Sequence, residues 1–226
     1  MAKNENQQEV VVAEAVGKTE KFFQENGKYV MVGLLAVVIV VVAGYFYKSV
    51  IIDGNAEKAS EMIVEAQERF GVENPDFVLA LNGDDNGAGF LDVVEQYGST
   101  PAGNLAKHYA GICYLRTGDL ENAEKYLAMY DAVNELAAEV VNAQNLGLRG
   151  DIAVEKGEYE AAVALYKKAV AASKNIYTAP LFLYKQVLAY AALGNKEEAQ
   201  KCLDILKADY AMSTEAREAE KVVGSL

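Results

Sequence analysis

An unbroken apolar run near the N-terminus, Tyr29 to Tyr47, constrains this chain more than any other feature. As an α-helix its nineteen residues would span about 28 Å, close to the roughly 30 Å hydrocarbon core of a bilayer. Lys28 and Lys48 flank the run, and tyrosines stand at both ends, where interfacial aromatic side chains gather. A cleaved signal peptide and a buried core helix are the alternatives, but the apolar core of a signal is shorter, lies nearer the N-terminus and ends at small residues. The sequence therefore predicts a retained transmembrane helix at residues 29–52, behind an N-terminal tail of residues 1–28.

Two weaker features accompany this predicted helix. The tail contains a short apolar stretch, which predicts either an amphipathic interfacial helix or a disordered segment. Small residues within the apolar run fall roughly on one helical face, where they would let another transmembrane helix approach closely. Alanine and glycine are also frequent in membrane helices, so ordinary composition is the alternative explanation. This candidate docking stripe consists of Gly33, Ala36, Ala43 and Gly44.

The rest of the chain, residues 53–226, carries the whole net charge of −12. It holds 28 acidic against 16 basic side chains, whereas the tail and the apolar region are balanced. An acidic domain of this kind repels nucleic acid and anionic headgroups, so we expect neither as a partner. Solubility alone is enough to explain the acidity, and the length suits one folded domain.

Catalytic and metal-binding patterns are missing from the sequence. Cys113 and Cys202 lie far apart within apolar helical patterns and are expected to pack as small apolar residues, although a disulfide is possible in an oxidising compartment. The one histidine, His108, has no evident nucleophile or acid partner. No zinc-ligand spacing, P-loop, G-x-S-x-G or G-x-G-x-x-G motif is present. We therefore expect a protein that is not an enzyme and that uses no metal, cofactor or small-molecule substrate.

Residues 53–103 are predicted to form an amphipathic helix and a connecting segment. After Asp53-Gly54-Asn55, which could break or kink the helix, apolar residues recur on one side and glutamates on the other. Further on, the apolar run FVLAL predicts an extended segment and the cluster NGDDNG a tight turn. That cluster superficially resembles a calcium loop, but its acidic residues do not alternate and no glutamate closes a twelve-residue frame.

Beyond this segment the helical patterns are punctuated by Gly118, Gly157 and Gly194. These glycines are 39 and then 37 residues apart, a period typical of solenoids built from helical hairpins. A glycine between two helices permits a left-handed C-cap and a sharp reversal of the chain. Close packing of the two helices also needs small residues on both sides of the turn. The chain supplies Gly111 and Ala123, Gly150 and Ala162, and Ala199 after the third turn.

The segments around these turns, GICYLRTGDLENAEKYL, GDIAVEKGEYEAAVALYKKA and VLAYAALGNKEEAQKCL, resemble the core of the tetratricopeptide repeat. The resemblance covers roughly residues 104–210, although Val187 replaces a first-helix glycine and the periods exceed the usual 34. A capping helix is expected at about residues 213–224. The resemblance implies an all-α fold, with a single N-terminal transmembrane helix followed by a tetratricopeptide-like α-α superhelix in residues 104–226.

Such a superhelix offers a concave surface, built from the first helix of each hairpin, that can hold an extended or helical peptide. Spacing from the turn glycines directs seven residues towards this groove, with core packing as the alternative for each. The row is mixed, with an apolar end, an acidic middle and one arginine. The Lys and Asn cluster with which some tetratricopeptide domains grip chaperone C-termini is missing. The candidate groove residues are His108, Ile112 and Arg116 in the first hairpin, Asp151 and Glu155 in the second, and Tyr184 and Leu188 in the third.

The whole layout of tail, anchor, amphipathic helix and terminal repeat domain resembles the YfgM-type ancillary subunit family of the SecYEG translocon. The resemblance implies a single-pass protein of the inner membrane, with a cytoplasmic N-terminus and a periplasmic repeat domain. It also implies a scaffold or chaperone-like role in protein transport, with translocon subunits, a periplasmic folding factor or client polypeptides as partners. Lysines are slightly more numerous just before the apolar run than just after it, so the charges favour a cytoplasmic N-terminus only weakly. The alternative is a membrane-tethered structural or regulatory adaptor whose cytoplasmic repeat domain binds a soluble partner or self-associates.

Overall fold

The computed structural model describes residues 26, 28–29, 31 and 35–226, and the chain divides into two compact units, residues 1–55 and 56–226. Most of the tail, for which an interfacial helix or a disordered segment is expected, lies outside the described residues. Gly33 of the docking stripe lies outside them as well.

The first unit contains a long apolar helix. Residues 35–46 are α-helical, a π-helical stretch η1 follows at Tyr47–Asp53, and the chain continues directly into α2, Gly54–Phe70. The break anticipated at Asp53-Gly54-Asn55 is therefore not found, because the backbone stays helical from Leu35 to Phe70 and only its pitch changes over Tyr47–Asp53. Every described side chain from residue 35 to residue 50 is exposed. The helix is long and apolar enough to cross a membrane by length and composition, and a signal sequence passes the same test.

The stripe residues Ala36, Ala43 and Gly44 are exposed on this helix. No heavy atom lies within 4 Å of the position that a Cβ on Gly44 would take. The described part of the chain therefore leaves this face open, and a helix docking on it remains a prediction.

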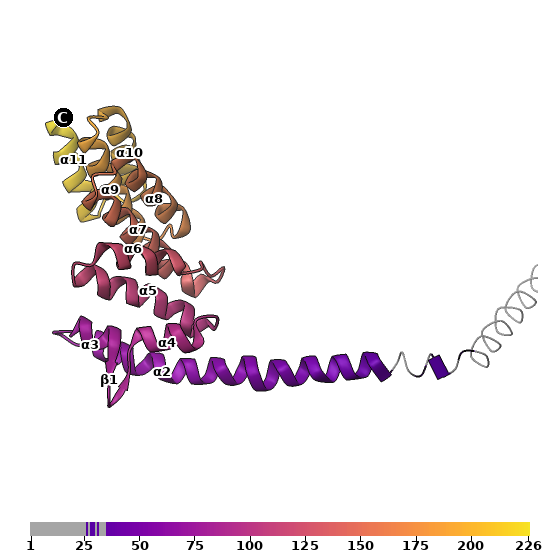
Figure 1. Cartoon of the computed structure of the whole chain (residues 1–226). Helices are drawn as coiled ribbons and strands as arrows, with labels where there is room; N and C mark the ends of the chain where they lie inside the picture. The colour runs from indigo at the N-terminus through magenta and orange to yellow at the C-terminus, as the bar shows by residue number, and fades with distance from the viewer. Residues whose placement is uncertain (1–25, 27, 30, 32–34) are drawn as a thin grey trace, which may run out of the picture. The chain divides into compact units, whose positions relative to one another are not determined.

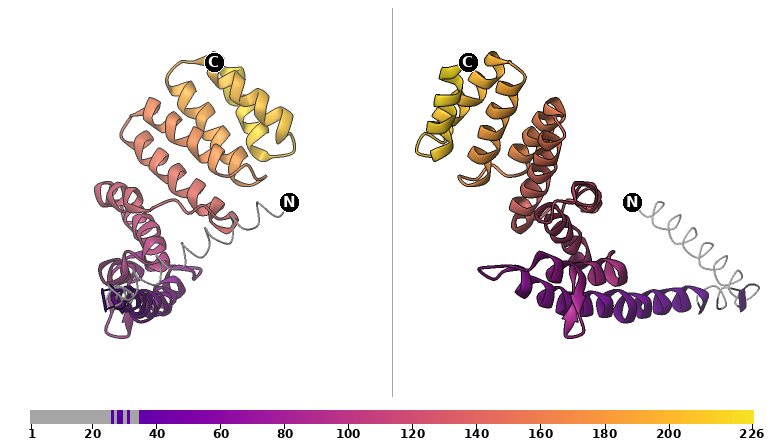
Figure 2. Two further views of the ribbon diagram at one scale, coloured as in Figure 1. Left: turned by 90° about the vertical axis from the view of Figure 1, so that its right-hand side faces the viewer. Right: turned by 60° about the vertical axis from the view of Figure 1, so that its left-hand side comes forward.

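The second unit is helical apart from one short β-hairpin (Figure 1). Strands β1, Gly83–Asp84, and β2, Gly87–Ala88, pair antiparallel. From α3 onward, consecutive α-helices pack on one another, and the last helix lies against the two before it, as the two views of Figure 2 show. The helices are α3 Phe77–Asn82, α4 Phe90–Tyr97, α5 Pro101–Arg116, α6 Leu120–Met129, η2 Leu136–Ala138 (a 3-10 turn), α7 Glu139–Glu155, α8 Tyr159–Ala172, α9 Thr178–Ala192, α10 Lys196–Asp209 and α11 Thr214–Ser225. This arrangement confirms the predicted all-α superhelix, and α11 forms the expected C-terminal cap.

All three predicted turn glycines adopt the left-handed backbone conformation. The φ angles of Gly118, Gly157 and Gly194 are 85°, 77° and 68°. At each turn the glycine amide donates to the carbonyl three residues earlier, and the next amide donates to the carbonyl five residues earlier. This pair of hydrogen bonds is the Schellman motif, and it satisfies carbonyls that the end of a helix leaves unpaired.

The small residues beside these turns permit the close helix crossings that the repeat needs. A Cβ on Gly111 would lie 2.6 Å from Leu127 Cγ, and one on Gly150 would lie 2.5 Å from Tyr166 Cε1. In the third hairpin a fully buried Val187 stands in place of the glycine. The hairpins α5–α6 and α7–α8 therefore depend on glycine at the crossing, whereas α9–α10 tolerates a branched side chain.

The hydrophobic core of the second unit is divided into two large clusters. Residues of α2, α3, α4 and α5 form the first cluster, and residues of α7 to α11 form the second. A small cluster of Ala123, Leu127 and Ile152 lies between them. Hydrogen bonds also join α5 to the segment after α6. The Asn104 side chain bonds both the amide and the carbonyl of Asp131, at 2.8 and 2.7 Å.

The expectation of an extended segment at FVLAL is wrong, because these residues form α3. Asp76 is the N-cap of this helix, and its carboxylate accepts the amides of Val78 and Leu79 at 3.0 and 2.9 Å. The periodicity of a short apolar run does not distinguish a strand from a buried helix. Here the N-cap hydrogen bonds of Asp76 favour the helix. The tight turn expected at NGDDNG is confirmed as the turn of the β-hairpin.

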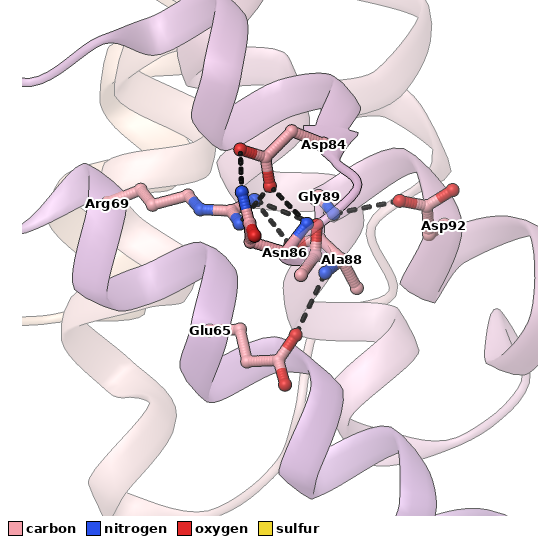
Figure 3. A network of polar contacts seen from close by, with 8 residues as sticks. Glu65, Arg69, Asp84, Asn86, Ala88, Gly89 and Asp92 are labelled. Atoms are coloured by element: carbon pink, nitrogen blue, oxygen red, sulfur yellow. Dashed lines mark hydrogen bonds and ion pairs between the residues drawn. The ribbon is translucent and has the colours of Figure 1, made fainter.

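Two side chains of α2 hold this β-hairpin in place (Figure 3). Glu65 accepts the amide of Ala88 at 2.8 Å. Arg69 donates to the carbonyls of Gly87 and Ala88 at 3.0 and 3.2 Å and pairs with Asp84 at 2.7 Å. We call Glu65 and Arg69 the hairpin clasp. Because the clasp joins α2 to a hairpin some twenty residues later in the chain, it fixes α2 as part of the second unit.

We expect Arg69→Ala to destabilise the second unit by about 2 kcal/mol, because charged hydrogen bonds contribute most when their partners are sheltered. The Arg69 side chain is 18% exposed, and its loss leaves two carbonyls without this donor. Urea unfolding followed by circular dichroism measures the change, and hydrogen exchange at the Ala88 amide locates it. The control is Lys221→Ala, which removes an exposed pair with Glu218 and should cost under about 0.5 kcal/mol. Equal effects of the two substitutions would contradict a structural role for the clasp.

Candidate peptide-binding groove

Three of the seven predicted groove residues lie together. Asp151 and Glu155 of α7 and Leu188 of α9 line a single groove with a volume of about 350 Å³. The groove runs between the first helices of the second and third hairpins, with α8 contributing one side. Its other lining residues are Val154, Tyr159, Tyr166, Lys185 and Ala189.

An ion pair with a third partner occupies the middle of the groove. The Lys185 ammonium donates to both carboxylate oxygens of Asp151 at 2.7 Å. The Tyr166 hydroxyl donates to one of the same oxygens at 2.7 Å. Burial and this hydrogen bond raise the pKa of Tyr166, so its hydroxyl stays a donor at physiological pH. The Asp151 carboxylate is therefore fixed in position before any ligand arrives.

Lys185 thus neutralises one of the two acidic residues, Asp151 and Glu155, that were predicted in the middle of the groove. The spacing of the turn glycines did not indicate this lysine. Lys185 also lies over the rings of Tyr166 and Phe182, with its Nζ 5.9 and 6.0 Å from their centroids. Attraction between a cation and these ring faces adds to the ion pair. The 37-residue step from Gly157 to Gly194 makes Leu188, and not Lys185, the position that corresponds to Asp151, so the repeat spacing does not point to this pair.

Glu155 lies one helical turn beyond Asp151 on α7, and Leu188 and Ala189 lie about one turn beyond Lys185 on α9. Glu155 is exposed and has no hydrogen bond or ion pair within the part of the chain that the structure describes. Its neighbour Lys156 is already paired with Glu124 of the first hairpin. Because Asp151 pairs with Lys185, this spacing puts Glu155 at the level of Leu188 and Ala189 in the groove, which Val154 also lines, and Leu188 is 42% exposed. This combination can receive an apolar side chain and a positive charge side by side.

The other four predicted groove residues lie elsewhere. His108 and Ile112 are buried, so the core-packing alternative holds for both. Arg116 is exposed, with its guanidinium 5.5 Å from the ring centroid of Phe77 in α3. Tyr184 is half-buried against the C-terminal core cluster. Of the apolar residues in the predicted row, Ile112 and Tyr184 therefore pack against the protein itself, whereas Leu188 stays exposed in the groove.

His108 is held at the contact between α5 and α7. It is 1% exposed, and Asn145 Nδ2 approaches its Nδ1 at 3.3 Å. The rings of Tyr109 and Tyr130 lie on either flank, each 5.7 Å from the imidazole between centroids. Burial lowers the pKa of His108 to about 4, and a contact from Gln144 opposes this only in part. The imidazole is therefore neutral at physiological pH and packs as a polar core residue.

Both cysteines are free and buried. Burial raises the pKa of Cys113 to about 12 and that of Cys202 to about 11, so neither forms a reactive thiolate near neutral pH. Cys202 Sγ instead lies 3.7 Å from the buried Gln186 carbonyl oxygen. The expectation that the cysteines pack as small apolar residues is confirmed.

Comparison with known proteins places a tetratricopeptide repeat at residues 143–176, which span most of α7 and α8. The crystal structure of a tetratricopeptide repeat protein from Parabacteroides merdae matches with a TM-score of 0.57 and 20% sequence identity, over 74% of this chain and 59% of that one. A putative kinesin light chain with nearly identical TPR-like repeats from Podospora anserina matches with a TM-score of 0.48 and 14% identity, over 77% of this chain and 84% of that one. No curated protein matches the sequence at a significant level. The chain therefore contains one matched tetratricopeptide repeat and shares the fold of the Parabacteroides merdae protein, and the groove lies across the matched repeat and the hairpin after it.

Proposed function

We propose that this protein is a membrane-anchored interaction module whose repeat domain receives a segment of another polypeptide in the groove between α7 and α9. Tetratricopeptide repeats are protein-interaction modules, and the observation that carries the proposal is the groove itself. It combines an exposed leucine, a fixed ion pair and a carboxylate without a described partner on two parallel first helices. Surfaces of this kind bind peptides through an apolar anchor and a few positioned charges.

The membrane anchor of this proposal is the apolar helix of the first unit. Its exposed aliphatic side chains favour a lipid environment over water. In its finer form, the proposal places the repeat domain in the periplasm and assigns it a scaffold or chaperone-like role beside the Sec translocon or another envelope complex. The support for this form is the resemblance of the layout to the YfgM-type family.

Topology is the first experiment, because it separates this form from the cytoplasmic adaptor. Met212 is 91% exposed in the turn before α11, and both native cysteines are buried, so Met212→Cys creates one reactive thiol in the full chain. A membrane-impermeant maleimide should label it in whole cells with a permeabilised outer membrane. The matched control is Asn4→Cys in the tail, which should be labelled only after lysis. The reverse pattern would put the repeat domain in the cytoplasm and remove the translocon proposal.

Occupation of the groove is tested by site-specific photo-crosslinking in native membranes. A photoreactive residue replaces Leu188 in one full-length variant and Ile205 in another. These two aliphatic side chains are 42% and 44% exposed, but Ile205 lies on α10 and does not line the groove. We expect position 188, and not 205, to crosslink to a translocon or envelope-complex subunit or to a polypeptide in transit, identified by mass spectrometry. Equal crosslinking at both positions would contradict a role for the groove.

A further inference from the structure

We infer that the groove selects a polypeptide segment in which a lysine or arginine stands next to an aliphatic side chain. This inference rests on the proposed function and names the chemistry of its partner. It begins from Glu155, which is exposed in the groove without an ion pair or hydrogen bond in the described chain. The lysine that lines the groove and the lysine that follows Glu155 in the chain are both already engaged. Lys185 is bound to Asp151, and Lys156 to Glu124.

The same geometry disfavours an acidic partner. Lys185 is the only basic residue among those that line the groove, and its ammonium already contacts both oxygens of Asp151. Releasing it to meet an incoming carboxylate would leave Asp151, in a partly sheltered site, without its counter-charge. An incoming acid would also approach Glu155 with like charge.

An apolar side chain beside the partner's positive charge has a place to bind. Val154, Leu188 and Ala189 line the groove together with Glu155, and Leu188 keeps a large part of its side chain in water. Covering that surface is favourable in proportion to the apolar area removed from water. Charge alone would not fix the position of a flexible segment. The aliphatic contact therefore holds the segment in place, and Glu155 selects segments that carry a positive charge.

The charge of residues 53–226 acts in the same direction at longer range. Their net charge of −12 attracts a cationic segment during encounter and repels an anionic one. The effect is electrostatic, so added salt should slow association and weaken binding.

The inference is tested by fluorescence anisotropy with the full chain in phosphatidylcholine nanodiscs. The probe is a fluorescein-labelled peptide of three Ala-Leu-Ala-Arg repeats. Two matched peptides carry glutamate in place of arginine or serine in place of leucine, and empty nanodiscs give the lipid background. We expect the first peptide to bind more tightly than either matched peptide, and more weakly when sodium chloride is raised from 50 to 500 mM.

Substitutions in the protein test whether the peptide binds in the groove. Glu155→Gln should weaken the arginine peptide about three-fold, the scale of one exposed ion pair, and Leu188→Ser about ten-fold through loss of apolar contact. The control Glu160→Gln removes one exposed charge outside the groove and should change little. Equal binding of the glutamate peptide, or equal effects of the substitutions at 155 and 160, would overturn the basic-partner inference. Failure of every peptide to bind would overturn it too, whereas crosslinking from position 188 decides separately whether the groove is a docking site.

Discussion

Gly103→Ala is expected to destabilise the repeat domain by about 3 kcal/mol or more, at the upper end of what overpacking costs. A Cβ at this position would lie 1.9 Å from the carbonyl oxygen of Tyr97 and 2.7 Å from the Cα of Gly98. Both atoms belong to the backbone, so no side-chain rotation relieves the overlap. Only a separation of α4 from α5 makes room, and that separation opens the N-terminal core cluster around Phe90.

The direction of the stability change tests the close packing, because helix propensity alone predicts that Gly103→Ala would stabilise the protein. An alanine inside a helix is favoured over glycine by about 1 kcal/mol. Gly224 of α11 provides the matched control, since no heavy atom lies within 4 Å of the Cβ that it would gain. Urea unfolding of the full chain in detergent should therefore show Gly224→Ala unchanged or more stable and Gly103→Ala strongly destabilised. Stabilisation of both variants would mean that α4 and α5 do not approach as closely as described.

The hairpins were predictable because their determinants are local. A glycine that must adopt a positive φ, with small residues about one helical turn or more away, restricts the chain to few alternatives. Gly118, Gly157 and Gly194 therefore mark the turns in the sequence as clearly as in the structure. The helix α11 was expected on other grounds, since the end of a solenoid needs a capping helix, and Ser213 begins it by accepting the amide of Ala216.

The groove was predictable only in part because it depends on contacts between hairpins. Spacing along one helix placed Asp151 and Glu155 on the face of α7 that lines the groove but carried no information about Lys185 on another helix. The same limit applies to His108, whose burial depends on how α7 packs against α5. Registers between elements are set by packing at long sequence separation, which a helical period does not encode.

The stability of the protein is expected to fall by about 3 kcal/mol between pH 6.5 and pH 4 through His108 alone, since each pKa unit corresponds to about 1.4 kcal/mol. The folded pKa of about 4 lies below the ordinary value of 6.5, so the unfolded chain takes up a proton in this interval and the folded chain does not. The contribution is therefore complete above pH 6.5 and is lost as the pH falls through 4. Protonation would also place a second N–H against the Asn145 amide, which already donates to Nδ1.

His108→Gln isolates this contribution, because glutamine does not titrate and His108 is the one histidine of the chain. We expect urea unfolding at intervals from pH 7.5 to pH 4 to follow the unfolding free energy of the natural protein minus that of the variant. This quantity should fall by about 3 kcal/mol as the pH is lowered. The carboxylates that titrate in the lower part of this range are the same in both proteins, so they cancel in the difference. An NMR titration of the imidazole gives the pKa directly. A value near 6.5, with no change in the difference, would mean that His108 is solvated and available to the groove, contrary to its burial between α5 and α7.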